Sequence, residues 1–217
     1  MQRQTKPQDR ILDAAMRVFR RHGFRRSSIE QAAEEAGLTR QALYHHFDSK
    51  EALFRAVIER LYESALAAEN AAAKAGEEAG KSLSDIIFAE ISARLRQLVS
   101  SLEGSPHMEE LFSEHLAQAS DLYQTYATRF AGEVAATIAR VRRKRELALA
   151  RGMSPRELAR LVEMAVHGTK SAYPSMLPID AFLKDLKTML RVLMAGAVAS
   201  EGMPQAKTSR RTREKRK

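Results

Sequence analysis

The stretch Ser27–Lys50, SSIEQAAEEAGLTRQALYHHFDSK, constrains the fold more than any other part of the 217-residue chain. Its first half predicts a short helix from about Ile29 to Ala36. Ser27 is a suitable N-cap, because a serine hydroxyl accepts a hydrogen bond from a free amide of the first turn. Glu30, three residues later, completes a capping box. We therefore expect a helix to begin directly after this serine.

A tight turn and a second helix follow. Gly37 is expected to end the first helix, because glycine takes the left-handed conformation at low cost. Thr39 then caps a second helix from about Arg40 to Phe47. Two helices joined by a short turn with glycine form a helix-turn-helix unit. The second helix of such a unit is the usual reader of the DNA major groove.

The composition favours a globular protein with a packed interior, since hydrophobic residues make up 44% of the chain. Cysteine is absent, which excludes disulfides, thiol catalysis and cysteine zinc sites and fits a reducing cytoplasm. No apolar run approaches the roughly 20 residues that a membrane-spanning helix needs. The polar start of the chain lacks the apolar core of a signal peptide. We therefore expect a cytoplasmic protein without membrane contact.

The positive charge is concentrated at the two ends of the sequence. Residues 1–60 contain 12 Lys/Arg against 8 Asp/Glu, and residues 201–217 contain 7 against 2. Residues 61–200 contain 17 of each, so the middle of the chain is neutral. A basic excess that coincides with a helix-turn-helix unit favours a polyanionic partner over a mere gain in solubility.

The remaining sequence repeats apolar residues at helical spacing and shows no sustained alternation of period two. We therefore predict an all-α fold of about nine helices. Besides the helix-turn-helix unit, the expected helices cover residues 9–22, 49–74, 83–103, 106–119, 121–150, 154–172 and 180–200.

Many residues of the first quarter of the chain resemble, at fixed spacing, the TetR family of transcriptional regulators. They are Ile11-Leu12-Asp13-Ala14-Ala15, Phe19, Gly23-Phe24, Ser27-Ser28-Ile29, Ala33, Ala36-Gly37-Leu38-Thr39, Leu43-Tyr44-His45-His46-Phe47 and Lys50-Glu51-Ala52-Leu53. The later three quarters resemble the family only in their all-helical layout. The ligand domain diverges freely in that family, so the resemblance implies no particular ligand.

The resemblance suggests how the chain is divided. Residues 9–48 would be the helix-turn-helix DNA-binding domain, and residues 49–200 would be the ligand-binding and dimerisation domain. Residues 1–8 would be a flexible basic arm, and residues 201–217 a disordered basic tail. Each basic end is either a further contact to double-stranded DNA or a solvated segment.

The expected second helix of the unit presents side chains suited to reading bases. Arg40 suits guanine through O6 and N7, and Gln41 suits adenine through N6 and N7. Thr39, near the helix N-terminus, suits a phosphate. His45 suits a phosphate or a thymine methyl group. The alternative for each of these polar residues is plain exposure to solvent.

Three further DNA contacts are implied by the resemblance alone. They are Ser28, Tyr44 and Lys50, each as a contact to a backbone phosphate. Such contacts position a protein on DNA without reading its sequence.

The last two expected helices carry apolar stripes suited to a homodimer. The stripes are Leu158, Leu161, Val162 and Ala165 on one helix and Leu186, Met189, Leu190 and Leu193 on the other. They would pair with their symmetry mates as a four-helix bundle, which the resemblance also implies. The alternative is that both stripes face only their own core.

Large apolar side chains in the middle helices are candidates for a pocket that binds an unknown small-molecule effector. They are Phe88, Met108, Phe112, Tyr123, Tyr126 and Phe130, with His167 or His115 as a polar anchor. Ordinary core packing explains the aromatic residues equally well. No cofactor is expected. We also expect no metal site, because His107 and His115 stand eight residues apart, too far to chelate one ion alone.

The sequence AGEEAGKS at Ala75–Ser82 fits a loose phosphate-loop pattern. A phosphate loop needs a preceding strand, whereas a helix is expected here, so we interpret this stretch as a flexible loop between helices. Nucleophile elbows and His-Glu-x-x-His motifs are absent from the sequence, so we expect no enzyme. The favoured hypothesis is a DNA-binding repressor released from a palindromic operator by a small apolar or aromatic ligand. The alternatives are a helical protein-binding module with nonspecific DNA affinity and a nucleotide-binding enzyme that uses this loop.

Overall fold

The computed structural model describes residues 7–150, 152–173 and 175–198 and confirms the all-α prediction. Its helices in this part of the chain are α1 (Pro7–His22), α2 (Ile29–Glu35), α3 (Arg40–Tyr44), α4 (Lys50–Glu78), α5 (Leu83–Ser100), α6 (Met108–Gln118), α7 (Ser120–Arg145), α8 (Pro155–Ala172) and α9 (Ile179–Ala197). Extended structure in the described residues amounts to an isolated bridge between Leu149 and Val198. The expected basic tail and most of the expected basic arm lie outside the described residues. Pro7 and Gln8, which we assigned to the arm, belong to α1.

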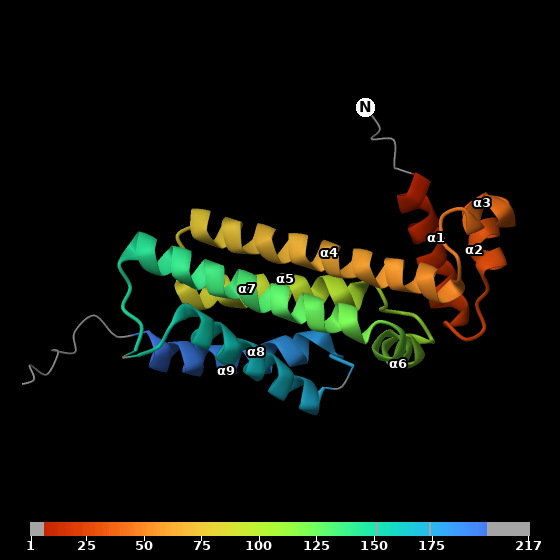
Figure 1. Cartoon of the computed structure of the whole chain (residues 1–217). Coiled ribbons are helices and arrows are strands. Elements are labelled where there is room, and N and C mark those ends of the chain that lie inside the picture. Colours follow the sequence, from red (N-terminus) through yellow and green to blue (C-terminus); the bar gives the residue numbers. More distant parts are fainter. Residues whose placement is uncertain (1–6, 151, 174, 199–217) are drawn as a thin grey trace, which may run out of the picture.

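The helices form a small head and a long body (Figure 1). Helices α1, α2 and α3 gather at one end of the molecule. Helix α4 starts at this head and runs the length of the body beside α5 and α7, while α8 and α9 pair on the opposite side. The short α6 lies at the junction between head and body.

The first helix of the helix-turn-helix unit is capped one residue later than predicted. Ser28 is the N-cap, and Gln31 completes the capping box in place of Glu30. The Ser27 hydroxyl is buried and donates a hydrogen bond to the carbonyl of Gly23, whereas the Ser28 hydroxyl accepts from the Gln31 amide of α2. The local pattern alone did not distinguish two adjacent serines, whose roles depend on this contact with the end of α1.

The turn and the second cap agree with the sequence prediction. Gly37 has a φ of +68°, in the left-handed region. The Thr39 side chain accepts a hydrogen bond of 3.1 Å from the amide of Ala42. The second helix is shorter than predicted, since α3 ends at Tyr44 rather than at Phe47.

The predicted loop over residues 75–82 was wrong in its first half. Helix α4 continues to Glu78, so only residues 79–82 connect it to α5. Packing explains the extension: a Cβ at Gly76 would lie 3.0 Å from Ile86 Cγ1, and Arg140 Nη2 lies 2.7 Å from Glu77 Oε1. The first four residues of the motif are thus helical, and their amides do not converge on a phosphate site.

Several later helices also end before their predicted boundaries. Helix α5 ends at Ser100 rather than at residue 103, and α7 ends at Arg145 rather than at residue 150. Glu146 takes a left-handed conformation with a φ of +55°, which stops α7 although the apolar spacing continues.

The side chains of α4 join two hydrophobic cores. Its first turns enter the core of the head, where the ring centroid of Phe54 lies 5.2 Å from that of Phe19 and 4.7 Å from that of Phe24. Near its other end, Ala73 packs into the second core, which is built from α5, α7, α8 and α9. The head and the body are therefore connected by one continuous helix.

A buried group of charges crosses the body. Arg94 of α5 is 3% exposed, and its guanidinium lies 2.8 Å from Glu163 Oε1 of α8 and 3.3 Å from Glu69 Oε1 of α4. Burial raises the pKa of Glu69 to about 9, although the neighbouring Arg94 opposes the shift. Burial also raises the pKa of Glu90 to about 7. These carboxyl groups hold a proton more tightly in the folded protein than in the unfolded chain.

This difference predicts that stability falls as the pH rises. The contribution of Glu69 is fully present below its unfolded pKa of 4.5 and is lost progressively up to its folded pKa of about 9, by at most about 1.4 kcal/mol per pH unit. Glu69→Gln cannot ionise, so its unfolding midpoint should fall less between about pH 6 and about pH 9 than that of the native protein. Thermal unfolding across this range is the measurement, with the exposed Glu59→Gln on the same helix as control. Parallel curves for all three proteins would contradict the assignment.

Candidate DNA interface and ligand cavity

Helix α3 and its flanking residues expose most of the predicted DNA contacts. Leu43 is fully buried in the head and anchors the helix. The side chains exposed around it are Thr39, Arg40, Gln41, Tyr44 and His45. The fold thus brings five of the seven predicted contacts together on one short exposed segment.

Arg40 is the most constrained of these side chains. Its Nε lies 2.9 Å from Glu30 Oε1, and its guanidinium carbon lies 5.4 Å from the centre of the Tyr44 ring. The ion pair is exposed, and such pairs contribute only about 0–1 kcal/mol. A guanine or a phosphate can therefore replace the Glu30 carboxylate at small cost.

Ser28 and Lys50 are placed differently from the other predicted contacts. Ser28 is half-buried, and its hydroxyl oxygen accepts a hydrogen bond of 3.3 Å from the Gln31 amide. The Ser28 hydroxyl hydrogen remains available as a donor, because this contact uses only the oxygen.

The Lys50 ammonium is bound within the head. It donates to the carbonyls of Phe24, Ser27 and Arg25 at 3.0, 3.1 and 3.4 Å, and it lies 4.4 Å from the centre of the Phe24 ring. An ammonium has three N–H donors, so these carbonyls use all of them. Lys50 thereby fastens the start of α4 to the turn between α1 and α2. Its predicted contact with a phosphate would require these hydrogen bonds to break.

Helix α6 also contacts the turn between α1 and α2. The Arg25 amide donates to Glu110 Oε1 at 2.8 Å, and Arg25 Nε lies 2.8 Å from Glu114 Oε1. The space beside Gly23 is filled by the Glu110 carboxylate, so any side chain at this position would collide with it. Sequence analysis missed these two carboxylates, because nothing in a sequence indicates which distant turn a helix will contact.

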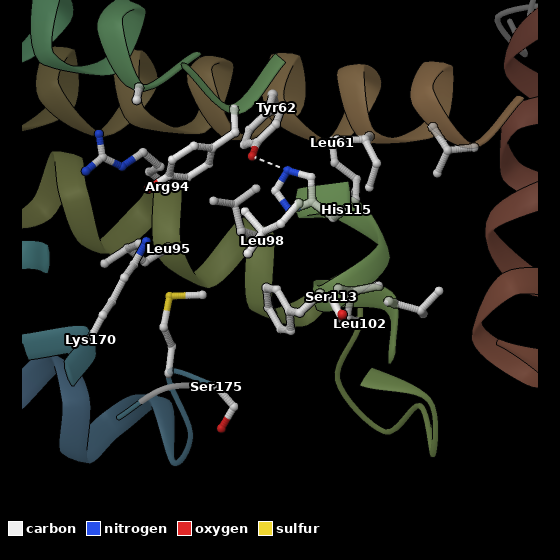
Figure 2. Close-up of a pocket in the computed structure, with 18 of the residues that line it drawn as sticks. Leu61, Tyr62, Arg94, Leu95, Leu98, Leu102, Ser113, His115, Lys170 and Ser175 are labelled. Carbon is white, nitrogen blue, oxygen red and sulfur yellow. Dashed lines mark hydrogen bonds between the residues drawn. The ribbon is translucent and has the colours of Figure 1, made fainter. Parts of the chain in front are cut away.

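A cavity of about 670 Å³ lies between the helices of the body and the head. Phe112, Tyr123, Phe130 and His167 of the predicted ligand residues line it, as does His115. Figure 2 shows the cavity walls with side chains converging from several helices. Its volume falls within the ordinary range for small-molecule sites.

Three predicted ligand residues do not line this cavity. Tyr126 stacks behind Tyr62 at a centroid distance of 4.8 Å, and its hydroxyl donates to Glu63. Met108 is buried in the core of the head, and Phe88 packs against the second core. Helical spacing alone does not separate a side chain that lines a cavity from one that fills solid core.

The sequence analysis also missed most of the cavity wall. Further lining residues come from α4, α5 and α8 and include Leu61, Tyr62, Arg94, Leu95, Leu98, Glu163 and Lys170. An available signal was the position of Arg94, one turn after Glu90, within the mainly apolar stripe of α5, since a charged side chain inside a core needs a partner or a polar site.

The Tyr62 hydroxyl and His115 Nε2 are 2.6 Å apart, and a dashed line marks this contact in Figure 2. Burial lowers the pKa of His115 to about 4, and the charge of Lys170 adds to the shift. The imidazole is therefore neutral at neutral pH.

Within the described residues, no group of three His, Cys, Asp or Glu side chains is arranged to hold a metal ion. Among the described helices, none is both long and apolar enough to cross a membrane.

With this geometry established, comparison with known proteins identifies the N-terminal domain. Residues 11–57 match the family described as bacterial regulatory proteins, tetR family. The N-terminal segment is thus a TetR-family domain. The match confirms the resemblance seen in the sequence, and the TetR family consists of transcriptional regulators rather than enzymes.

Two curated TetR-family relatives are similar in the same region. The transcriptional regulator UidR of Escherichia coli strain K12 is 41% identical over 68 residues, which are 31% of this chain and 35% of UidR. The transcriptional repressor NicS of Pseudomonas putida is 40% identical over 63 residues, which are 29% of this chain and 30% of NicS. The chain thus spans about a third of the length of these curated relatives.

The fold of this chain is also similar to the folds of solved structures. SmeT, the repressor of the multidrug efflux pump SmeDEF of Stenotrophomonas maltophilia, matches with a TM-score of 0.60 and 20% identity. The match covers 91% of this chain and 93% of SmeT. At this identity the likeness concerns the fold alone.

The hydrogen bonds of Lys50 predict that this side chain stabilises the head. Lys50→Ala should lower the free energy of unfolding by about 1–3 kcal/mol, because it leaves three carbonyls of the turn without their donor. Lys74→Ala is the matched control, since the Lys74 side chain is 79% exposed on the same helix. Denaturant unfolding of both variants measures the difference. Equal stabilities, with DNA binding weakened only in Lys50→Ala, would instead favour a phosphate contact.

Proposed function

We propose that this protein is a sequence-specific DNA-binding transcriptional repressor that acts as a homodimer and releases its operator when a small ligand fills the cavity. One observation carries the proposal: in a TetR-family domain, α3 is anchored by the buried Leu43 and exposes a continuous set of side chains suited to DNA. We assign its site of action to the bacterial cytoplasm, where the DNA is located.

We propose that α3 enters the major groove and that Arg40 and Gln41 read bases. Arginine matches guanine O6 and N7, and glutamine matches adenine N6 and N7, each with two hydrogen bonds. Thr39, Tyr44 and His45 surround these readers and are suited to backbone phosphates. Ser28 completes the proposed contacts through its free hydroxyl hydrogen.

TetR-family regulators are typically dimers, and we propose α8 and α9 as the dimer surface of this chain. The predicted stripes need correction here, because Leu158, Val162, Leu186 and Leu190 are buried in the core of their own subunit. Met189 of the predicted stripes remains exposed (44%), and the other exposed apolar side chains of these helices, Met164 (55%) and Val192 (69%), lie outside the stripes.

Two glycines extend this outward face. Gly168 follows Met164 by four residues, and Gly196 follows Val192 by four, so each pair lies on one side of its helix. A Cβ added at either glycine would meet no atom within 4 Å. Small residues beside exposed apolar ones permit close approach of a partner helix. The outward positions of α8 and α9 therefore support a four-helix interface with a second copy.

We propose that the cavity controls the head through two helices. Its wall includes Leu61 and Tyr62 of α4 together with Phe112 and His115 of α6. Helix α4 enters the core of the head, and α6 holds the turn between α1 and α2 through Glu110 and Glu114. A ligand that binds one arrangement of these helices more tightly increases the population of that arrangement, and with it the corresponding position of the head.

Selection of bound DNA from a random pool tests the proposed function. The native protein should select two inverted half-sites, as expected for a two-fold dimer. Arg40→Ala combined with Gln41→Ala should lose the base preference at the contacted positions, at about 1–3 kcal/mol for each. A matched control is Arg142→Ala with Gln124→Ala, which removes the same side chains from exposed positions of α7. An unchanged sequence preference in the first variant would refute the assignment of α3.

Charge substitution tests the proposed dimer surface. Met189→Asp combined with Val192→Asp should yield monomers, because burying unpaired carboxylates in an interface costs about 3–5 kcal/mol. Sedimentation measures the change. Leu116→Asp is the control, since Leu116 is 54% exposed but lies on α6. A double variant that remains dimeric would place the interface elsewhere.

A further inference from the structure

Four polar side chains of the cavity wall, those of Tyr62, His115, Arg94 and Glu163, are bound to other side chains. The Tyr62 hydroxyl contacts His115 Nε2 at 2.6 Å. Arg94 contacts both Glu69 and Glu163, and its guanidinium lies 4.6 Å from the centre of the Phe130 ring. The rest of the wall consists mainly of leucine and aromatic side chains. A ligand therefore meets a mainly apolar surface, to which Ser113, Tyr123 and Ser175 add uncharged hydroxyl groups.

Lys170 differs from Arg94, the other cation of the cavity wall, because no carboxylate of the described residues is paired with it. It extends from α8 into the cavity, toward Leu95 and Arg94 (Figure 2). Within the described part of the chain, its ammonium has no hydrogen-bond or ion-pair partner. Burial lowers the pKa of Lys170, and the nearby positive charge of Arg94 lowers it further, while Glu163 opposes the shift.

The charges around Lys170 do not balance. Arg94 and Lys170 are the cations of the cavity wall, and Glu163 is held by Arg94 at 2.8 Å. Glu69 is fully buried, and its raised pKa of about 9 keeps it mainly protonated at neutral pH. Glu109 also lines the cavity but is exposed to solvent. The cavity wall thus encloses two cations and one carboxylate, Glu163, that is already paired with Arg94, while the buried Glu90 acts on Arg94 from outside the wall.

We propose that the effector is an organic acid with an apolar body, and that its carboxylate pairs with Lys170 while the body fills the space beside Leu95, Leu98 and Phe112. The proposal rests on the proposed function, because it specifies the chemistry of the ligand that controls the head. A carboxylate supplies both a negative charge and an acceptor for the ammonium. The apolar wall selects a hydrocarbon or aromatic body over a small inorganic anion, which would leave most of the cavity unfilled.

Direct binding without DNA tests this assignment. The uncharged dye N-phenyl-1-naphthylamine reports occupancy of the cavity, and decanoate and decan-1-ol compete with it as a pair with the same chain and different charge. The native protein should bind decanoate at least about tenfold more tightly than decan-1-ol, as expected for one charge-assisted hydrogen bond. Lys170→Met should reduce this ratio to about one and leave the affinities for the dye and the alcohol within about twofold. Unchanged dye binding also shows that the variant is folded.

Two further variants define the role of the charge. Lys170→Arg should keep the preference for decanoate, since it keeps a cation at this position. Lys187→Met is the matched control, because Lys187 lies against Phe88, outside the cavity wall, and is exposed. It should keep the native ratio.

The outcomes separate this inference from the proposed function. Equal affinities for decanoate and decan-1-ol in the native protein would overturn the acidic ligand. A preference that survives in Lys170→Met would overturn the role of Lys170. Neither result concerns DNA, whose recognition is tested independently by selection from the random pool. Displacement of the selected operator by decanoate and not by decan-1-ol would support both proposals together.

Discussion

The packing of the first turns of α4 into the head is the interaction on which the rest of the structure depends. The ring of Phe54 packs against those of Phe19 and Phe24, which also contact each other, and the neighbouring Leu53 is fully buried. Lys50 adds hydrogen bonds to the turn that precedes α2. The head therefore cannot rotate independently of α4, because rotation would expose these rings to water. We propose that a movement of α4 in the body is transmitted to α3 through this packing.

The buried charges of the body show a second constraint. Arg94 is almost inaccessible to water, so its charge is tolerated only because Glu163 and Glu69 approach it from two other helices. These contacts hold α4, α5 and α8 together at the wall of the cavity. A polar group in that wall costs stability, and it lets the cavity distinguish a polar ligand from an apolar one. Lys170 lies at the same wall and is the group that we propose pairs with the carboxylate of the ligand.

The helix-turn-helix unit was predictable because its signals are local. Thr39 and Gly37 act through neighbouring amides and through the backbone of one residue, so their roles follow from adjacent positions. The misplaced cap at Ser27 shows the limit of this reasoning, since a contact with the end of α1 decided which serine caps α2. Lys50 shows the same limit, because its carbonyl partners lie 23 to 26 residues away in the sequence.

The sequence by itself determined that the secondary structure of the described chain is almost entirely helical, that it has a helix-turn-helix head, and which side chains α3 exposes. Helical periodicity and capping suffice for this, because both act within one or two turns. Only the tertiary structure decided that Phe112 and Phe130 line a cavity while Tyr126 stacks behind its wall. It also decided that Lys170 faces this cavity without a partner among the described residues. These outcomes depend on which helices meet and leave a space between them, and that spacing is set by contacts between residues far apart in the chain.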